Sequence, residues 1–526
     1  MSSMAETLES LVELGPGGIA RFAASLDPDW IDQALAATGS ASIRRRKLPA
    51  EQAVWLVLGM GLFEDRSIVD VVEHLSLVAP GVKSLAPSAI PAARYRLGSE
   101  PMKWLFDKVA SVWSDSPGFS KYRGLSLYGV DGSHLRVQDS DENFEHFGKP
   151  GGRAGSGDAG YPQLRVACLL NLSNRLLADA CFGSWAVSEQ KLATELWPSV
   201  PDSSLTILDR GFINFHSIAT LMHGGTNRHV MIRLRRDNNP EVIETLADGS
   251  LSVNLRPSAA LRKEHPDLPE TLKGRVIEYK HPGGEQSRIF VSLTDPALYP
   301  AQELINLYHE RWELEIAFDE LKTHMLERRE CLRSKKPDGV RQELWGLLLT
   351  YNLVRREMIL AAHEQGLPSQ RISFRSSLLW IRNFWIMAWH STPGAIPRHL
   401  GEFRSTLNAL VIPERRSERQ YPRHVKIKMS NYPRNRGKRR PPPSVVTMNG
   451  LFDGPGKYSN FINLAVRPLA GIGSPSPGPR GFRSGACGGR ASPWAMLAHT
   501  RASASGWKLG GGRARCASVA RPVPRR

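Results

Sequence analysis

The sequence predicts an α+β protein, a mixed α/β chain in which helices and strands follow one another in blocks. Three observations lead to this class. Apolar residues recur at helical spacing through residues 1–115, short alternating or β-branched runs follow between residues 125 and 293, and helical spacing returns after Pro300. Strands followed by a β-rich stretch and then by helices are typical of an α+β core that is interrupted by a subdomain.

The first 115 residues are expected to form a helical N-terminal domain. Pro49 marks a helix start, and apolar residues recur at helical spacing from Ala53 to Leu62 and again from Val69 to Leu75. No run in this part alternates as a strand would. We therefore expect helices throughout residues 1–115.

Strand patterns begin after the N-terminal helices. Leu125 to Val130 is a short apolar run that ends at Asp131, and residues 164–172 and 176–182 are two more runs joined by a three-residue turn. The intervening residues 148–160 are rich in glycine and show no periodicity. The sequence thus predicts a strand, a loop and a hairpin.

Two helices and a strand come next, before a β-rich passage and a return to helices. Residues 188–196 and 215–221 are helical in pattern, and the strand 205–208 between them ends at Asp209. Strands are expected over residues 229–234, 276–280 and 289–293. Helices are expected over residues 301–326, 339–363 and 378–389.

The composition, 41% hydrophobic and 23% charged residues, is that of a soluble globular protein. No run of eighteen apolar residues is present, so we expect no membrane span. Glu6 and Glu9 at the N-terminus do not fit a secretory signal peptide. The five cysteines are widely spaced without a CxxC pair, which fits a reducing cytoplasm.

The net charge of +18 is concentrated at the C-terminal end of the chain. In residues 415–526, Lys and Arg outnumber Asp and Glu by 21, which leaves residues 1–414 with a net charge of −3. A nucleic-acid surface in the main body must then come from local clusters such as residues 44–47 or 233–236. Each cluster is explained equally well as a solvated face.

Two of the predicted strands end in an aspartate with a glycine one or two residues later, at Asp131 and Asp209. A carboxylate at the rim of a sheet beside a glycine leaves room for a ligand. Either motif alone is ordinary turn chemistry. The pair in one sheet indicates a site for a hard cation such as Mg²⁺, which binds two or three carboxylates and phosphate oxygens.

A third signal lies in the expected helix 301–326. At about 100° per residue, four of its side chains fall within an arc of roughly 60°: Tyr308, Arg311, Glu315 and Lys322. Such a face is either a salt-bridged solvent face or a metal ligand flanked by phosphate donors, because Arg binds phosphate bidentately and Lys supplies a point charge.

This pattern, Y-x2-R-x3-E-x6-K, resembles the signature of DDE transposases of the insertion sequence four (IS-4) family at every fixed position. Asp131 in Tyr-Gly-Val-Asp-Gly-Ser and Asp209 in Ile-Leu-Asp-Arg-Gly-Phe are similar to the two catalytic aspartates of that family. The segments 46–49 and 425–433 also resemble its N-terminal and C-terminal parts. The likeness covers about residues 25–436.

The resemblance implies an RNase H-like catalytic core interrupted by a β-rich insertion, with a helical N-terminal domain and a helical C-terminal region. The implied domains are residues 1–115, for DNA binding or an accessory role, and 116–330, the catalytic domain with its insertion at about 225–298. Residues 331–440 would form the helical C-terminal region with a basic end, and residues 441–526 a disordered tail.

The resemblance also implies a function, a cofactor and partners. A bacterial transposase would bind terminal inverted repeats of double-stranded DNA and carry out Mg²⁺-dependent cleavage and strand transfer into target DNA, as a homodimer in the paired-end complex at the nucleoid. Asp131, Asp209 and Glu315 would be catalytic and would hold two divalent cations, with Mn²⁺ as a substitute for Mg²⁺. Tyr308, Arg311 and Lys322 would contact DNA. The alternatives are an RNase H-like nuclease without strand transfer and an inactive end-binding regulator.

One departure from the best-known relatives concerns the expected insertion. Residues 210–311 contain no tryptophan, whereas family members that form a DNA hairpin stack a flipped base on an aromatic side chain there. Tyr279, Phe290 and Tyr299 are the remaining candidates, and each also suits a packing role in a sheet. A hairpin step therefore stays open.

The last 86 residues have the composition of a disordered segment. Residues 441–526 contain 14 Gly, 11 Pro and 9 Ser with a net charge of +11 and almost no periodic apolar pattern. Out-of-frame translation of a GC-rich gene gives such a composition. We therefore expect a frameshifted or read-through extension in preference to an evolved DNA-binding arm.

Overall fold

The computed structural model describes residues 26–41, 47–75, 77, 85–113, 120–150, 160–280, 286–327, 331–390 and 410–412. These residues all belong to one compact unit, Met1–Pro422. The predicted tail and residues 151–159 of the expected glycine-rich loop lie outside the described residues.

The described residues between 26 and 113 are mostly helical, as the spacing of their apolar residues predicts, while residues 1–25 and 42–46 of the expected helical domain lie outside the described residues. Pro49 is the N-cap of the second described helix, and Ser67 caps the third through reciprocal hydrogen bonds with Asp70 at 3.1 and 3.2 Å. The helices are α3 (Pro28–Ala37), α4 (Ala50–Leu62), α5 (Ile68–His74), α6 (Ala89–Leu97) and α7 (Glu100–Trp113).

A ten-stranded mixed sheet follows, with strand order β4-β3-β2-β5-β6-β10-β9-β8-β7 and the short β1 paired to β2. The pairs β2–β5 and β5–β6 are parallel, and the others are antiparallel. The strands are β1 (Lys121–Tyr122), β2 (Leu125–Arg136), β3 (Gln163–Asn171), β4 (Leu177–Ser184), β5 (Ser204–Leu208), β6 (Arg228–Arg233), β7 (Glu241–Thr245), β8 (Leu251–Leu255), β9 (Leu272–Lys280) and β10 (Gln286–Val291). The mixed α/β class is confirmed.

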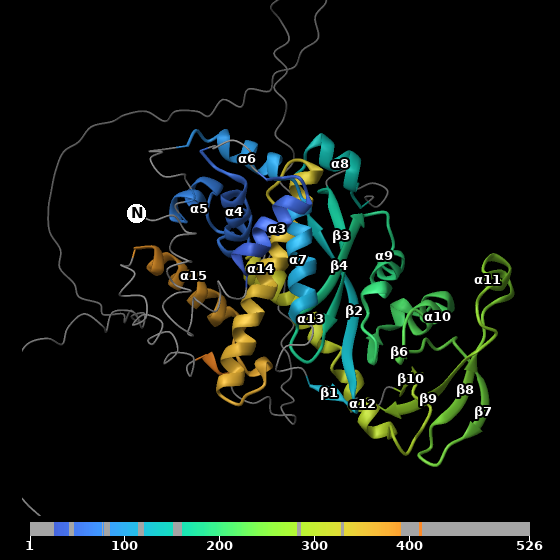
Figure 1. Ribbon diagram of the computed structural model, residues 1–526. Helices are drawn as coiled ribbons and strands as arrows, with labels where there is room; N and C mark the ends of the chain where they lie inside the picture. The colour runs from blue at the N-terminus through green and yellow to red at the C-terminus, as the bar shows by residue number, and fades with distance from the viewer. Residues whose placement is uncertain are drawn as a thin grey trace, which may run out of the picture. The chain divides into compact units, whose positions relative to one another are not determined.

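The β-rich stretch continues this sheet instead of forming a separate one. Strand β10 pairs with β6, and β9, β8 and β7 follow outward along the same sheet (Figure 1). Strands β7 and β8 are absent from the sequence prediction. All five residues of β7 are exposed, so the strand has no buried face and its sequence shows no apolar alternation.

Strand β2 does not end at Asp131, contrary to the prediction from the sequence. It runs five residues further, because β3 pairs with residues Asp131 to Arg136 in antiparallel register. Its parallel partner β5 does end at Leu208. Asp131 therefore lies within a long strand, at the level where the neighbouring strand stops.

Helices cover both faces of the sheet (Figure 1). Helix α14 and the N-terminal helices share one hydrophobic core with one face, and α9 and α10 share a second core with the other. The remaining helices are α8 (Asp141–Phe147), α9 (Glu189–Leu196), α10 (Phe215–His223), α11 (Ala259–Glu264), α12 (Ala301–His309), α13 (Trp312–Asp319), a π-helix (Glu320–Met325), α14 (Pro337–Glu364) and α15 (Phe374–His390).

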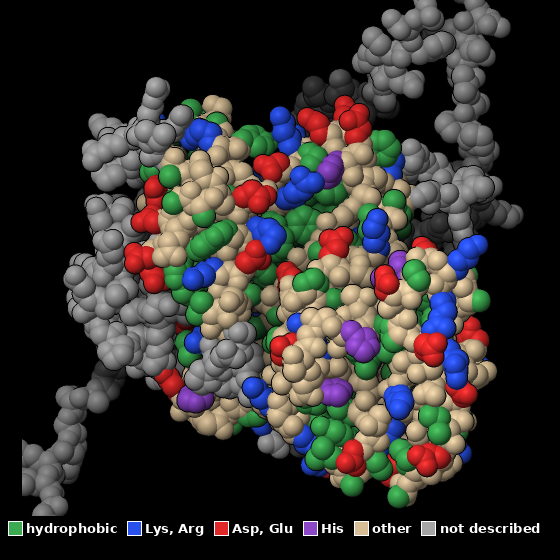
Figure 2. All heavy atoms as spheres, turned by 45° about the vertical axis from the view of Figure 1, so that its right-hand side comes forward, with side chains coloured by type: hydrophobic (Ala, Val, Ile, Leu, Met, Phe, Trp, Pro, Cys, Tyr) green, Lys and Arg blue, Asp and Glu red, His purple; other side chains and the backbone are tan. Residues whose placement is uncertain are grey.

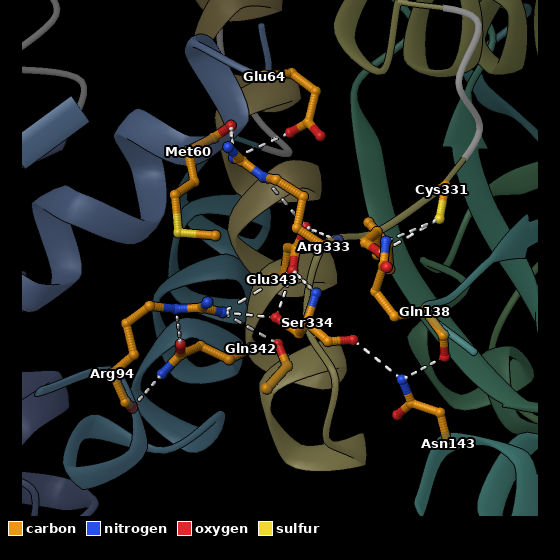
Figure 3. A network of polar contacts seen from close by, with 12 residues as sticks. Met60, Glu64, Arg94, Gln138, Asn143, Cys331, Arg333, Ser334, Gln342 and Glu343 are labelled. Carbon is orange, nitrogen blue, oxygen red and sulfur yellow. Dashed lines mark hydrogen bonds and ion pairs between the residues drawn. The ribbon is translucent and has the colours of Figure 1, made fainter. Parts of the chain in front are cut away.

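A buried polar network ties the N-terminal helices to the rest of the unit (Figure 3). Arg94 of α6 donates to Gln342 Oε1 at 2.9 Å and to Ser334 Oγ at 3.0 Å. Arg333 donates to the carbonyl oxygen of Met60 at 2.9 Å and forms an ion pair with Glu64 at 3.1 Å. Because buried charges are costly to leave unpaired, this network fixes α4 and α6 against α14.

Charges of both signs are mixed over the described surface. On the face drawn in Figure 2, Lys and Arg side chains alternate with Asp and Glu side chains. This agrees with the small net charge of residues 1–414. Within the described part of the chain, no helix has the length and apolar character needed to cross a membrane.

Candidate active site

The register of two parallel strands places Asp131 beside Asp209. Val130 of β2 pairs with Leu208 of β5; Asp131 is the next residue of β2, and Asp209 directly follows the end of β5. Neighbouring strands lie about 4.8 Å apart. The two carboxylates that the sequence singled out are therefore immediate neighbours across the sheet.

Both aspartates lie on the face of the sheet that α13 covers. Side chains alternate along a strand, and Gly129, two residues before Asp131, lies against Leu314 of α13, where an added Cβ would come within 2.7 Å of Leu314 Cδ1. Ile207, two residues before Asp209, belongs to the same core as Leu314. The glycine thus lets α13 approach the strand that carries Asp131.

The environment of Asp131 disfavours its charged form. Burial raises the pKa of this carboxyl from 3.8 to about 6, and the charges of Glu189 and Asp209 act in the same direction. The Gly132 N–H, which donates to Asp131 Oδ1 at 2.8 Å, and the Arg311 guanidinium oppose that rise. Asp131 therefore holds its proton more readily than an exposed aspartate does.

Tyr308, in the last turn of α12, is buried beside the end of β5. Its hydroxyl lies 3.5 Å from the carbonyl oxygen of Leu208, the residue before Asp209. Burial raises the pKa of Tyr308 above its usual value. Tyr308 is therefore a neutral phenol that contacts the strand carrying the second aspartate.

Arg311 connects the aspartates with Glu315. Its Nη2 donates to Glu315 Oε1 at 2.9 Å. Burial alone lowers the pKa of Arg311, but the bond to Glu315 and the negative charges of Asp209 and Glu315 raise it overall. Arg311 is thus a fully charged guanidinium among three carboxylates.

The helix that carries this residue set is not continuous, contrary to the sequence prediction. Helix α12 ends at His309, and short-range bonds such as Arg311 N–H to the Tyr308 carbonyl, at 3.2 Å, tighten the chain before α13 begins. A π-helix follows from Glu320. A uniform rotation of 100° per residue therefore does not hold from residue 308 to residue 322.

Lys322 lies apart from the other three side chains of the predicted face. It lines a small cavity with Ser133 and Leu135 of β2, and its charge acts on His134. The structure thus brings Tyr308 and Arg311 to the aspartates, with Glu315 bonded to Arg311, and Lys322 to the next stretch of β2.

The three carboxylates of the site are the right kind of ligand for a divalent cation, but they are not arranged to coordinate one. Three carboxylates are the ligands that Mg²⁺ prefers, and Asp131 and Asp209 are adjacent. Among the residues that the structure describes, however, no three His, Cys, Asp or Glu side chains are close enough together to hold a metal ion. Glu315 is bonded to Arg311 instead.

Two further residues lie beside these carboxylates; Arg233 is named from the sequence only as part of the basic cluster 233–236, and Glu189 is not named. Arg233 stands beside Asp209, because Leu208 pairs with Ile232 in the parallel pair β5–β6. Glu189 of α9 lies against Gly132, where an added Cβ would come within 2.7 Å of Glu189 Cγ. Knowledge of the strand register alone would have identified Arg233. Glu189 carries no signal in its local sequence.

Two parts of the chain match domains of known protein families. Residues 16–107 match the domain described as "Insertion element 4 transposase N-terminal", and residues 123–353 match the "Transposase DDE domain". The chain is 36% identical over 410 residues to the transposase InsG for insertion sequence element IS4 of Escherichia coli (strain K12), which covers 78% of this chain and 92% of InsG. The chain belongs to the IS4 family of transposases.

Two other similarities are weaker. The transposase is 32% identical over 245 residues to InsZ of Escherichia coli (strain K12), covering 44% of this chain and 79% of InsZ. The solved piggyBac transposase synaptic complex with hairpin DNA gives a TM-score of 0.37 at 10% identity, over 79% of this chain and 86% of that chain. A similarity as low as the latter establishes neither fold nor mechanism.

Family membership makes the protein a DDE transposase of an IS4 insertion element. DDE domains of this kind generally use divalent metal ions. The roles of the individual site residues remain predictions.

Proposed function

We propose that the transposase binds the terminal inverted repeats of its element, cleaves the DNA there and joins the ends to target DNA, with Asp131, Asp209 and Glu315 as catalytic carboxylates. The pairing of β2 with β5 supports this most strongly, because it sets the two aspartates side by side toward the helix of Glu315. In phosphoryl transfer the protein contributes mainly positioning and charge, and this arrangement supplies both.

The catalytic core is proposed to be RNase H-like. The antiparallel β2-β3-β4 strands on one side and the parallel β5 and β6 on the other form a five-stranded core with helices on both faces. Strands β7 to β10 then form the insertion. The helical residues 1–115 would serve DNA binding or an accessory role, and a homodimer would hold the paired ends.

Two Mg²⁺ ions held by the three carboxylates would activate the attacking water or 3′-hydroxyl and stabilise the leaving oxygen. Each side chain of the site has a proposed role in this reaction. Asp131 and Asp209 present oxygens from adjacent strands, and Glu315 presents a third carboxylate from α13. Arg311, which now donates to Glu315, has the planar donor geometry to bind a phosphate. Tyr308 and Lys322 would contact the DNA on either side.

The experiment that tests this function is a Mg²⁺-dependent assay on a duplex that carries the element's end, with cleavage and joining scored separately. Asp131→Ala and Asp209→Ala should each abolish both reactions while end binding persists. Asp202→Asn is the matched control, because Asp202 precedes the same strand β5 and its side chain is 58% exposed. Cleavage without joining by the wild type would make the protein a nuclease. Absence of cleavage would make it an end-binding regulator.

A further inference from the structure

A groove lined by arginines opens beside the proposed active site. It lies between the turn after β5, the end of β6 and the strands β9 and β10, and its volume is about 790 Å³. Among the described residues that line it, Glu278 is the single acidic one and none is aromatic. Its basic residues, called the arginine groove here, are Arg210, Arg233, Arg235, Arg236 and Arg288.

The arginine groove is continuous with the row of aspartates. Arg210 directly follows Asp209 in the chain, and Arg233 is aligned with Asp209 because β5 and β6 are parallel and in register at Leu208 and Ile232. Asp131, Asp209 and Arg233 thus occupy one level of three neighbouring strands. A linear ligand that is bound at the aspartates would therefore extend into the arginine groove.

The groove is organised by hydrogen bonds to uncharged partners. Arg288 Nη2 donates to the carbonyl oxygens of Arg235, Arg236 and Asn238, each at 3.0 Å, and its Nη1 donates to Asn239 Oδ1 at 3.2 Å. Arg235 Nε donates to the carbonyl oxygen of Arg210 at 3.2 Å. These bonds fix the loop after β6, and they do not neutralise the charges of Arg235 and Arg288 because every acceptor is an uncharged oxygen.

The positive charge of the groove is therefore available to a ligand. In the described part of the chain, Arg235, Arg236 and Arg288 form no ion pair with a carboxylate, and Arg235 and Arg236 are exposed. Glu278 already accepts a hydrogen bond from the Gln286 amide at 3.3 Å. Three guanidinium groups without a carboxylate partner on one concave surface, Arg235, Arg236 and Arg288, favour a polyanion over a protein segment.

We propose that the arginine groove binds the sugar-phosphate backbone of the DNA strand that leads away from the scissile phosphate. The proposal rests on the proposed function, since it takes the aspartates as the site of cleavage. Guanidinium groups bind phosphate oxygens bidentately. The absence of aromatic side chains in the lining leaves no platform for base stacking, so the groove contacts the backbone irrespective of base sequence. Arg288 acts here as a positioning residue for Arg235 and Arg236.

The test is a binding titration of the full chain with an end-containing duplex at several salt concentrations. Arg235→Ala and Arg236→Ala should each lower the slope of log K against log salt by about one, and the double variant by about two. Arg256→Ala with Arg262→Ala is the matched control. It removes the same charge from the same β-rich stretch, but Arg256 is paired with Glu241 at 2.9 Å and Arg262 with Glu270 at 3.6 Å. The control should leave the slope nearly unchanged.

Arg288→Ala separates positioning from simple loss of charge. We expect it to lower the slope by more than one and to accelerate amide hydrogen exchange in residues 235–239, which the Arg256→Ala control should not do. A slope in the double variant equal to that of the wild type would overturn the proposal. The proposed function is tested separately, because loss of cleavage in Asp131→Ala does not depend on the salt slope of the groove variants.

Discussion

Two sets of arginines show how differently the same side chain is used in this protein. Below the helix that carries Glu315, Arg355 is fully buried and donates to both carboxylate oxygens of Glu320 at 2.7 Å, and Arg175 donates to Glu320 Oε1 at 2.8 Å. In the arginine groove, Arg235 and Arg288 donate to neutral oxygens. Buried and neutralised arginines hold the fold together, whereas exposed and uncompensated arginines remain available to a partner.

The buried arginines affect the proposed active site because they fix the chain segment that contains Glu315. Glu313 of α13 is hydrogen-bonded to Arg175, and Glu320 begins the π-helix. Tyr351 donates to Glu320 Oε2 at 3.0 Å from α14. These contacts fix the two ends of the segment that contains Glu315, so they set the position of the proposed catalytic helix relative to the sheet.

Breaking the buried set should give the largest change in stability. Glu320→Ala leaves Arg355 buried without its carboxylate partner and Arg175 with Glu313 alone, and we expect a loss of about 3–5 kcal/mol in the free energy of unfolding. Urea denaturation of the full chain measures it. Arg235→Ala and Arg236→Ala, from the exposed set, should change the free energy by about 0.5 kcal/mol or less each. Equal losses in the free energy of unfolding would show that the buried and the exposed arginines contribute alike to the stability of the fold.

Asp131→Asn should stabilise the folded protein above pH 6 in the absence of metal. Burial raises the pKa of Asp131 to about 6 from an ordinary 3.8. The folded state therefore keeps a proton that the unfolded state releases, and the protein loses stability as the pH rises from about 4 to about 6. At about 1.4 kcal/mol per pKa unit, the gain on substitution is about 2–3 kcal/mol at pH 7.5.

The check on this pH dependence is a series of urea denaturation curves in EDTA between pH 4 and pH 8. The difference between Asp131→Asn and the wild type should vanish near pH 4 and grow toward pH 7. Asp267→Asn, at an exposed aspartate of the α11–β9 connection, should follow the wild type throughout. Parallel curves for Asp131→Asn and the wild type would show that the carboxyl is not buried as described.

The sequence reveals local structure well and long-range pairing poorly. Apolar periodicity predicts the N-terminal helices, the hairpin β3–β4 and the strand before Asp209, because each depends on neighbouring residues. It does not reveal that β2 continues past Asp131, since the cause is pairing with β3. The bonds from Arg175 to Glu320 and from the Tyr308 hydroxyl to the Leu208 carbonyl oxygen join residues more than ninety positions apart, and no local sequence pattern predicts them.

Arg311→Ala and Lys322→Ala should show smaller effects that separate the two residues. We expect each to weaken binding to element ends and to lower the salt slope by about one. Arg311 also opposes the rise in the pKa of Asp131, so its removal should raise that pKa further, whereas Lys322→Ala should leave it unchanged. Salt titrations and carboxyl NMR titrations measure the two effects. An unchanged slope in both variants would make these residues surface charges only.

The central claim concerns Glu315, since the aspartates are already adjacent and Glu315 is joined to Arg311. The most direct test is the rate of Mg²⁺-dependent cleavage of an element end by Glu315→Gln, with Glu310→Gln, five residues away beside the same bend in the chain, as the control. We predict that Glu315→Gln binds the end and does not cleave it, while Glu310→Gln cleaves at the wild-type rate. Cleavage by Glu315→Gln at more than a few per cent of that rate would contradict the assignment of Glu315 as the third catalytic carboxylate.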